Sequence, residues 1–163
     1  MKKKNLWVLA WVFWIAGFVC SAPLAICAEE TAGLSSGQAI YVPAYSHIYT
    51  GSREMPFLLT VTLSIRNVDP THSLKLTEVG CYGTEGALLK KYITTATTLK
   101  PLESLRYVVP EQDKTGGSGA NFMVRWQSAH PMNPPIVESI MIGTQAQQGI
   151  SFTSRGQVIV PSD

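Results

Sequence analysis

The chain has 163 residues, of which 45% are hydrophobic and 15% are charged, and its formal net charge at pH 7 is +2. This length suits one domain rather than two, and the composition is that of a globular protein. Three of the basic residues, Lys2, Lys3 and Lys4, stand together at the N-terminus, so the rest of the chain is close to neutral. A neutral body with scattered basic residues lacks the basic patch that nucleic-acid binding requires, and we expect no nucleic-acid partner.

The N-terminal segment has the features of an export signal. Residues 5–28 contain no charged side chain and follow the three lysines directly. A positive start, an apolar stretch and small residues near Ala28 predict a signal peptide over residues 1–28. Two alternatives stay open: an uncleaved membrane anchor, since about 20 apolar residues span a bilayer, and lipidation at Cys27. In each case we expect an exported, periplasmic protein that meets the membrane only through this segment or a lipid.

A polar segment separates this signal from a region rich in β-strand patterns. Residues 29–38, EETAGLSSGQ, are predicted to form a flexible linker. The folded domain is then expected to cover residues 39–160. Its first strand is predicted within residues 39–50, AIYVPAYSHIYT, where Pro43 confines the segment to a sheet edge or a bulge because proline cannot donate to a strand ladder.

The next two predicted strands have the clearest patterns. Residues 57–67, FLLTVTLSIRN, alternate apolar and polar side chains, as a half-buried antiparallel strand requires. In the following strand, residues 74–82, the apolar phase changes between Leu76 and Val79, which predicts a β-bulge. Cys81 lies in the same strand, while the other two of the three cysteines belong to the N-terminal segment. We therefore expect no disulfide framework and interpret Cys81 as a small buried core residue.

The remainder of the chain continues the β pattern. Further strands are predicted within residues 97–110, 121–127, 135–143 and 149–161. The chain shows no long stretch of helical spacing and no internal repeat. Seven to nine short strands separated by turns favour an all-β fold, a single antiparallel β-sandwich that is immunoglobulin-like in the broad sense, over a closed barrel.

A glycine-rich loop precedes the predicted strand at residues 121–127. A phosphate-binding loop needs a lysine and a hydroxyl after its last glycine, followed by a helix, but Ala120 and a strand follow here. Ser118 has one of the two flanking glycines of a hydrolase nucleophile elbow, so serine hydrolysis stays an alternative. We instead expect the glycines to turn a corner with positive φ and to form a binding loop. Its candidate residues are Gly116, Gly117, Ser118, Gly119 and Asn121.

A second candidate loop is rich in proline. Residues 128–135, SAHPMNPP, are predicted to form an exposed, stiff loop in which His130 is a candidate binding residue. His130 and Met132 also pair an imidazole with a thioether, a donor set that suits Cu(I). Copper binding is therefore an alternative hypothesis, and no other cofactor is expected.

Three stretches of the sequence together are recognisable: YVPAYSHIY followed by LLTVTLSIRN, then GGSGANFMVRW, then IMIGTQAQQGISFTSRG. They resemble the bacterial domain-of-unknown-function family 3124, which consists of small exported or lipid-anchored proteins. The resemblance covers residues 37–156, nearly all of the predicted mature domain. It implies the compartment and the β architecture, and it implies no activity, substrate or catalytic residue.

These observations lead to one hypothesis about function. We expect an exported β-sandwich that acts in the cell envelope as a non-catalytic binding or structural module. The loops at residues 113–121 and 130–135 are expected to lie at one end of the sandwich and to contact an envelope protein or a small ligand. The alternatives are periplasmic copper binding through His130 and Met132 and, from a third class, hydrolysis at Ser118.

Overall fold

A computed structural model of the chain describes residues 33–50, 53–145 and 147–159, which form twelve β-strands and one short 3-10 turn, η1 (Gly117–Gly119). One sheet has the order β12-β1-β9-β5-β6, with β7 also paired to β5, and a second sheet has the order β11-β10-β4-β8. The first sheet consists of β1 (Ser35–Pro43), β5 (Leu74–Tyr82), β6 (Leu88–Lys91), β7 (Thr97–Leu99), β9 (Asn121–Met132) and β12 (Gln157–Ile159). The second consists of β4 (Thr60–Arg66), β8 (Ser104–Val109), β10 (Ile136–Gln145) and β11 (Gln148–Arg155). The remaining pair, β2 (His47–Thr50) and β3 (Met55–Leu58), forms a hairpin.

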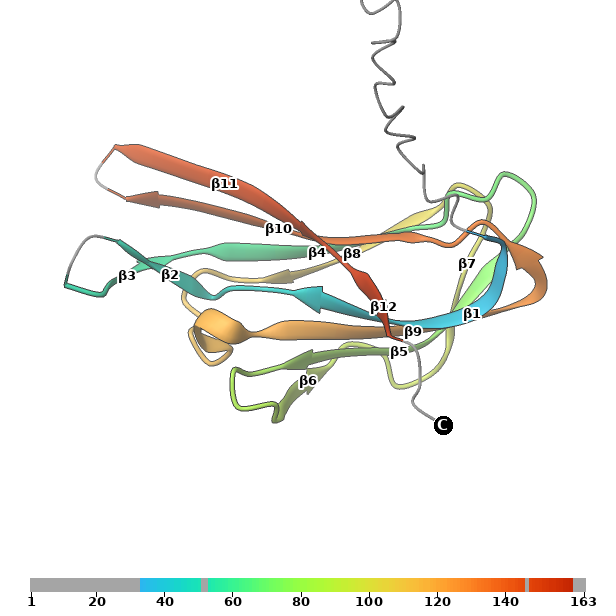
Figure 1. The fold of residues 1–163 in the computed structure, drawn as a ribbon, viewed down its shortest axis with the longest axis horizontal. Coiled ribbons are helices and arrows are strands. Elements are labelled where there is room, and N and C mark those ends of the chain that lie inside the picture. The colour runs from blue at the N-terminus through green and yellow to red at the C-terminus, as the bar shows by residue number, and fades with distance from the viewer. Residues whose placement is uncertain (1–32, 51–52, 146, 160–163) are drawn as a thin grey trace, which may run out of the picture. The chain divides into compact units, whose positions relative to one another are not determined.

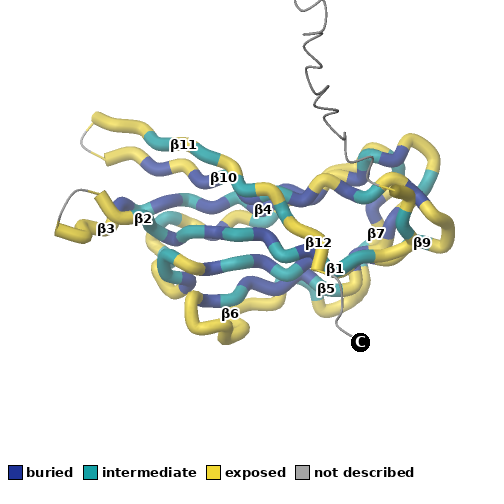
Figure 2. The backbone as a smooth tube through the Cα atoms, viewed as in Figure 1, coloured by how far each residue is buried: buried dark blue, intermediate teal, exposed yellow. Residues whose placement is uncertain are grey.

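The two sheets pack face to face as a sandwich (Figure 1), which confirms the predicted fold class. Buried and exposed residues alternate along the central strands (Figure 2), as expected where one face of each sheet covers the core. The largest buried side chains come from both sheets and include Trp126 and Phe122 from β9 and Leu63 and Ile65 from β4. No helix in the described part of the chain is both long and apolar enough to span a bilayer.

Strand β9 lies at the centre of the first sheet. It is antiparallel to β1 on one side and to β5 on the other. The ladder with β5 shifts register between Leu76 and Glu78, which confirms the bulge predicted from the apolar phase. This bulge lets Leu74 and Leu76 as well as Val79 and Cys81 point into the core although their sequence phases differ.

One side of the sandwich is closed by a strand that changes sheets. The chain leaves β11 at Arg155, passes through Gly156 and enters β12, which pairs with β1. A Cβ atom at Gly156 would lie 2.5 Å from Ile40 Cγ2 and 3.0 Å from the Val137 carbonyl oxygen, so this crossing needs a residue without a side chain. Nearby, the buried Ser139 hydroxyl donates a hydrogen bond to the carbonyl of Pro43, which links the two sheets.

Several predicted boundaries were wrong. The twelve strands exceed the expected seven to nine, because short strands such as β6, β7 and β12 carry no clear alternation. The predicted linker 29–38 overlaps β1, which begins at Ser35, and the predicted strand 39–50 is divided after Pro43. The predicted signal segment 1–28 and Cys27 lie outside the described residues.

A buried carboxylate fixes the end of the sandwich where β9 finishes. Asp69 accepts hydrogen bonds from the backbone N–H groups of Thr71 (2.9 Å), His72 (2.8 Å) and Asn133 (3.0 Å). The backbone donors of Asn133 and Thr71 hold the pKa of Asp69 well below its ordinary value, against the opposing effect of desolvation. One side chain thereby ties the loop after β4 to the loop after β9.

We predict that Asp69→Asn lowers the melting temperature at pH 7, and that the difference from wild type shrinks below about pH 4. The folded pKa lies below the unfolded pKa, so the stabilisation is complete above the unfolded value and is lost as the pH falls toward the folded one. Thermal unfolding followed by circular dichroism between pH 7 and pH 2 measures this, with the exposed Glu85→Gln as control. A difference that stays constant down to pH 2 would contradict the assignment.

Candidate functional site

A cavity of about 140 Å³ lies between the two sheets, beside the glycine-rich loop. Its first wall is formed by Cys81 and Phe122, which face each other across β5 and β9. Its second wall is formed by Val61 and Val109, which are paired across β4 and β8. The cavity is thus the end of the intersheet space, lined mainly by apolar side chains. Half-enclosed apolar cavities with a few polar groups are typical of small-molecule sites.

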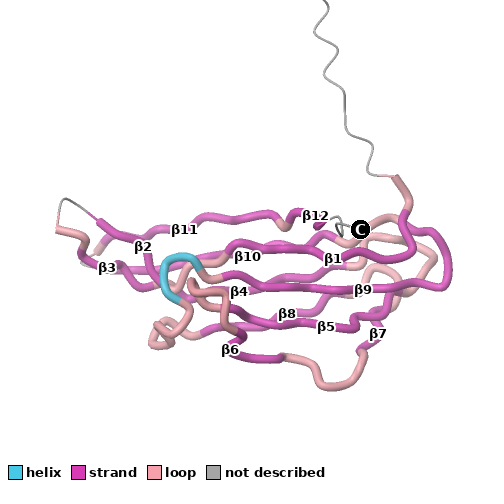
Figure 3. The backbone as a smooth tube through the Cα atoms, turned by 60° about the horizontal axis from the view of Figure 1, so that its bottom comes forward, coloured by secondary structure: helices cyan, strands magenta, loops and turns pink. Residues whose placement is uncertain are grey.

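The glycine-rich loop closes one side of this cavity and is held on both of its flanks. On one flank, the N–H of Ser46 donates to the carbonyl of Gly117 at 2.9 Å. On the other flank, the N–H and the hydroxyl of Thr84 both donate to the carbonyl of Gly116 at 3.0 Å. The Thr84 hydroxyl oxygen also accepts the N–H of Gly119 at 3.0 Å. The backbone groups of the loop are therefore held by hydrogen bonds to Ser46 and Thr84. Figure 3 shows the 3-10 turn of the loop next to β2.

The loop conformation requires glycine at one position. Gly117 has φ of +74°, in the left-handed region, and a Cβ atom there would also collide with Thr84 Oγ1. This confirms the prediction of a positive φ at this corner, although Gly116, with φ of −68°, does not share it. Gly116 is instead required for space, because a Cβ atom would lie 2.8 Å from Ser46 Oγ.

Lys90, which is exposed, and Tyr92, which is partly buried, line the cavity on its solvent side, which we call its mouth. Lys90 stands directly opposite Cys81 in the β5–β6 ladder, and both residues line the cavity. Residues directly opposite in an antiparallel ladder have their side chains on the same face of the sheet, so Lys90 is on the inner face although β6 is exposed. Its Nζ lies 4.9 Å from the centre of the Tyr92 ring, within the range of a cation–π contact. Burial, with smaller effects from Cys81 and Asp113, raises the pKa of Tyr92 to about 12, so its phenol stays protonated.

Asp113 supplies the opposite charge at the same cavity. Its Oδ1 atom accepts hydrogen bonds from the hydroxyl and, at 3.1 Å, from the N–H of Thr115. These two bonds, with a smaller contribution from Lys90, lower the pKa of Asp113, which is therefore a carboxylate at neutral pH. Burial is the main reason that the pKa of Cys81 is raised, and the Asp113 charge adds to it. Cys81 is thus a protonated thiol, which agrees with its interpretation as a buried residue.

Residues 37–159 match the family described as protein of unknown function (DUF3124), well over half of the chain. The chain belongs to DUF3124. This confirms the resemblance noted in its sequence. No curated protein matches the chain at a significant level. A solved structure, named as the crystal structure of Thermotoga maritima 1070, is similar with 12% sequence identity and a TM-score of 0.43, covering 74% of this chain and 92% of that chain.

The candidate residues of the glycine-rich loop differ in their relation to the cavity of the DUF3124 domain. Gly116 lines the cavity directly. Gly117 and Gly119 make the hydrogen bonds that hold the loop in place. Ser118, at the middle of the 3-10 turn, and Asn121, the first residue of β9, do not line it. The N–H groups of Gly117 and Gly119 already donate hydrogen bonds within the protein, to the Lys114 carbonyl and the Thr84 hydroxyl.

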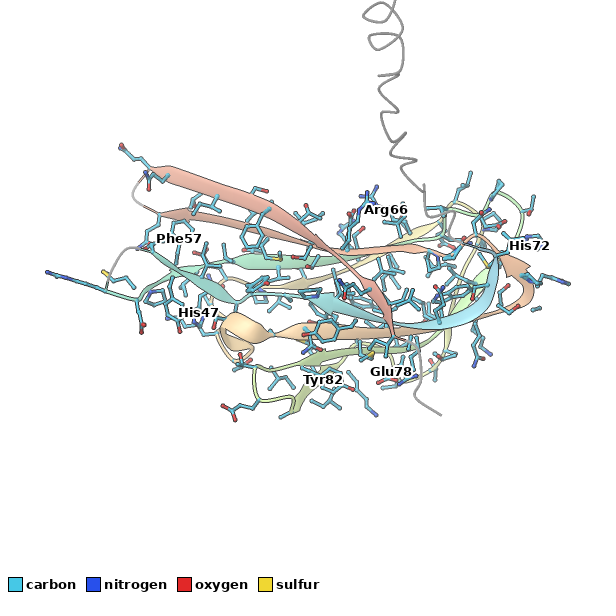
Figure 4. The ribbon with its side chains drawn as sticks, in the orientation of Figure 1. His47, Phe57, Arg66, His72, Glu78 and Tyr82 are labelled. Atoms are coloured by element: carbon cyan, nitrogen blue, oxygen red, sulfur yellow. The ribbon has the colours of Figure 1, made fainter. Side chains whose placement is uncertain are left out.

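The second candidate group lies at the other end of the DUF3124 domain, so the expectation that both loops share one end was wrong. Strand β9 runs from Asn121 to Met132 and separates the two groups by roughly 30 Å at about 3.3 Å per residue. His130 and Met132 belong to this strand and not to a loop. Figure 4 shows His47 and His72 at the two opposite ends of the sandwich.

The copper donor pair is not brought together in one environment. His130 is exposed and its ring lies 5.4 Å from the ring of His72, whereas Met132 is completely buried in the hydrophobic core. Among the described residues no group of three or more histidine, cysteine, aspartate or glutamate side chains could hold a metal ion. The geometry therefore adds no support to the copper hypothesis.

Of the residues that give the cavity its chemistry, Asp113 lies in the predicted loop 113–121, whereas Lys90 and Tyr92 were not predicted. The residues that line the cavity come from three separate segments: Cys81 from β5, Lys90 and Tyr92 from β6 and its end, and Asp113 from the loop before η1. Their proximity depends on the pairing of β5 with β6 and on the loop before η1. The one local signal was the segment LLKKYI, in which Lys90 stands two residues before the aromatic Tyr92.

We predict that Gly117→Ala destabilises the domain by about 1–3 kcal/mol, because it forces a side chain into the left-handed region and against Thr84. Chemical denaturation measures the change in the free energy of unfolding. Gly149→Ala is the matched control, since the nearest atom to a Cβ there is Thr144 Cγ2 at 4.0 Å. Equal effects of the two substitutions would show that the turn does not need glycine.

Proposed function

We propose that this DUF3124 domain is a non-catalytic binding module of the bacterial cell envelope and that the cavity beside the glycine-rich loop is its binding site. The observation that carries the proposal is the cavity itself, a half-enclosed space with apolar walls and with Lys90, Asp113 and Cys81 at its lining. Apolar walls supply affinity for a small ligand, and a few convergent polar groups supply its orientation. The fixed glycine-rich loop keeps this space open without reorganisation, which lowers the cost of binding.

The polar groups near the cavity support binding rather than catalysis. A nucleophilic thiol must lose its proton, and burial raises the pKa of Cys81. A nucleophilic serine needs a base, but His47 bonds to Tyr49 and His72 bonds to Asp69, while His130 lies at the far end. We therefore assign Ser118 to the turn that shapes the cavity and not to a reaction.

Export is supported by the sequence of the N-terminal segment. Three lysines followed by an uncharged apolar stretch describe a secretory signal. The partner is in that case a small molecule of the periplasm or a side chain of another envelope protein. Both would reach the cavity from solvent.

The export proposal predicts a mature protein that begins at Glu29. Mass spectrometry of the native protein, isolated from a bacterium that produces it, gives the mass of the N-terminal peptide. Cleavage after Ala28 yields an unmodified Glu29 terminus, and a lipoprotein yields a diacylated terminus at Cys27. An intact Met1 in a cytoplasmic fraction would rule out export.

The binding proposal predicts that a small apolar probe occupies the cavity. An engineered cavity of roughly 150 Å³ is known to bind benzene, so we expect benzyl alcohol to enter a space of this size and to shift the amide resonances of the lining residues. It should also slow the alkylation of the Cys81 thiol, followed on its own peptide by mass spectrometry.

A filled cavity provides the control for this experiment. Ala44→Leu adds three carbon atoms at a buried position of the lining and should abolish both effects, whereas Ala96→Leu adds the same atoms at an exposed position and should preserve them. Probe binding that is unchanged in Ala44→Leu would place the binding site elsewhere.

A further inference from the structure

We infer that the cavity binds a small zwitterionic amino acid with an apolar side chain, of about the size of leucine. The inference rests on the proposed function, because it names the ligand class of the same site. It follows from three features of the cavity: two opposite charges at its mouth, an apolar floor between the sheets, and a volume that fits one side chain.

The two charges at the mouth belong to side chains that are not paired with each other. Lys90 and Asp113 both line the cavity, and the described ion pairs join Arg66 with Glu138, His72 with Asp69, and Arg125 with Glu78 instead. Lys90 Nζ is placed over the Tyr92 ring, and Asp113 is oriented by Thr115 through Oδ1. Each charge is thus held by a neutral neighbour and keeps hydrogen-bonding capacity for a ligand.

The floor of the cavity is apolar and contributed by both sheets. Val61, Val109 and Phe122 are each less than one-tenth exposed and line the space together with Ala44 and Ala120. A volume of about 140 Å³ is close to that of a cavity that holds benzene, so it accommodates a branched aliphatic side chain. Burial of such a side chain is favourable by the hydrophobic effect.

A free amino acid combines these requirements in one molecule. Its α-carboxylate accepts hydrogen bonds from Lys90 Nζ, and its α-ammonium donates to the free Oδ2 atom of Asp113. The side chain then points to the apolar floor. A ligand with a single charge would leave either Lys90 or Asp113 partly desolvated without a partner, which disfavours it.

Lys90 also has a purely structural interpretation. Charged residues that point inward on an edge strand prevent that edge from pairing with another chain. Strand β6 ends one path of its sheet, so Lys90 fits this description. The two interpretations differ in their consequence, because a protective lysine does not affect the affinity of a ligand.

The test is isothermal titration of the full chain with L-leucine, leucinamide and N-acetyl-leucine. Leucinamide lacks the carboxylate and N-acetyl-leucine lacks the ammonium. We expect L-leucine to bind best and Lys90→Gln to weaken its binding about tenfold or more while leaving leucinamide unaffected, since a charged hydrogen bond is lost. Asp113→Asn should weaken L-leucine and leucinamide and leave N-acetyl-leucine unaffected.

Lys91→Gln is the matched control for Lys90. Lys91 stands opposite Gly80 in the same ladder and therefore on the outer face of the sheet, so this substitution should not change the binding of any of the three compounds. The folded state of each variant is verified by its melting temperature.

Two outcomes overturn the inference in different ways. If benzyl alcohol binds but L-leucine binds no better than leucinamide and N-acetyl-leucine, or Lys90→Gln has no effect, the cavity is a binding site for another ligand class. If neither L-leucine nor benzyl alcohol binds and Cys81 alkylation is unaffected by both, the proposed function fails together with the inference.

Discussion

The pairing of β9 with a strand on each side is the constraint on which the rest of the structure depends. Phe122, Val124 and Trp126 all point into the core from this strand and are completely or almost completely buried. Because side chains alternate between the faces of a sheet, a slip of one residue would expose all three and bury the polar residues between them. The register of β1 and β5 against β9 is therefore fixed by the hydrophobic effect, and both ends of the sandwich take their positions from the ends of β9.

The two ends of β9 are completed in different ways. Where the strand finishes, the carboxylate of Asp69 accepts hydrogen bonds from the backbone of both adjoining loops. Where the strand begins, the hydrogen bonds of the glycine-rich loop run to Thr84, which follows β5, and to Ser46, which follows β1. These are the two strands that flank β9, so the loop is held on both sides of its own strand. The cavity beside the loop lies at this end of β9.

The periodicity of the sequence was sufficient for the fold class and for details inside single strands. The alternation within residues 57–67 and 121–127 and the change of phase near Leu76 were predicted correctly, because they depend on which side chains reach the core. The structure divides the predicted strand 57–67 at Leu59, between β3 and β4. The start of β1 was missed because residues 35–38 are small and polar, and they are extended through their pairing with β9. His130 and Pro131 were assigned to a loop because prolines favour turns. In the structure, strand β9 continues through both residues to Met132.

The candidate site was predicted less completely than the fold. The glycine-rich loop was identified because glycine and serine clusters mark irregular backbone, and Gly116 does line the cavity. Cys81, Lys90 and Asp113 are brought together by pairings between segments that are separated in sequence. No local sequence pattern indicates that these residues will be neighbours, because their proximity depends on which strands pair.

The charges around the cavity favour the binding of a ligand ammonium group and disfavour ionisation of the Cys81 thiol. Burial raises the pKa of Cys81, and the negative charge of Asp113 raises it further, while Lys90 acts in the opposite direction. The carboxylate that suits an ammonium group of a ligand is thus one of the groups that keep the thiol protonated. An ammonium bound between them would offset the effect of Asp113 on the thiol, but it would also cover the sulfur and exclude other reactants. If the proposed ligand binds, it would therefore shield Cys81, whose raised pKa already makes the thiol a poor nucleophile.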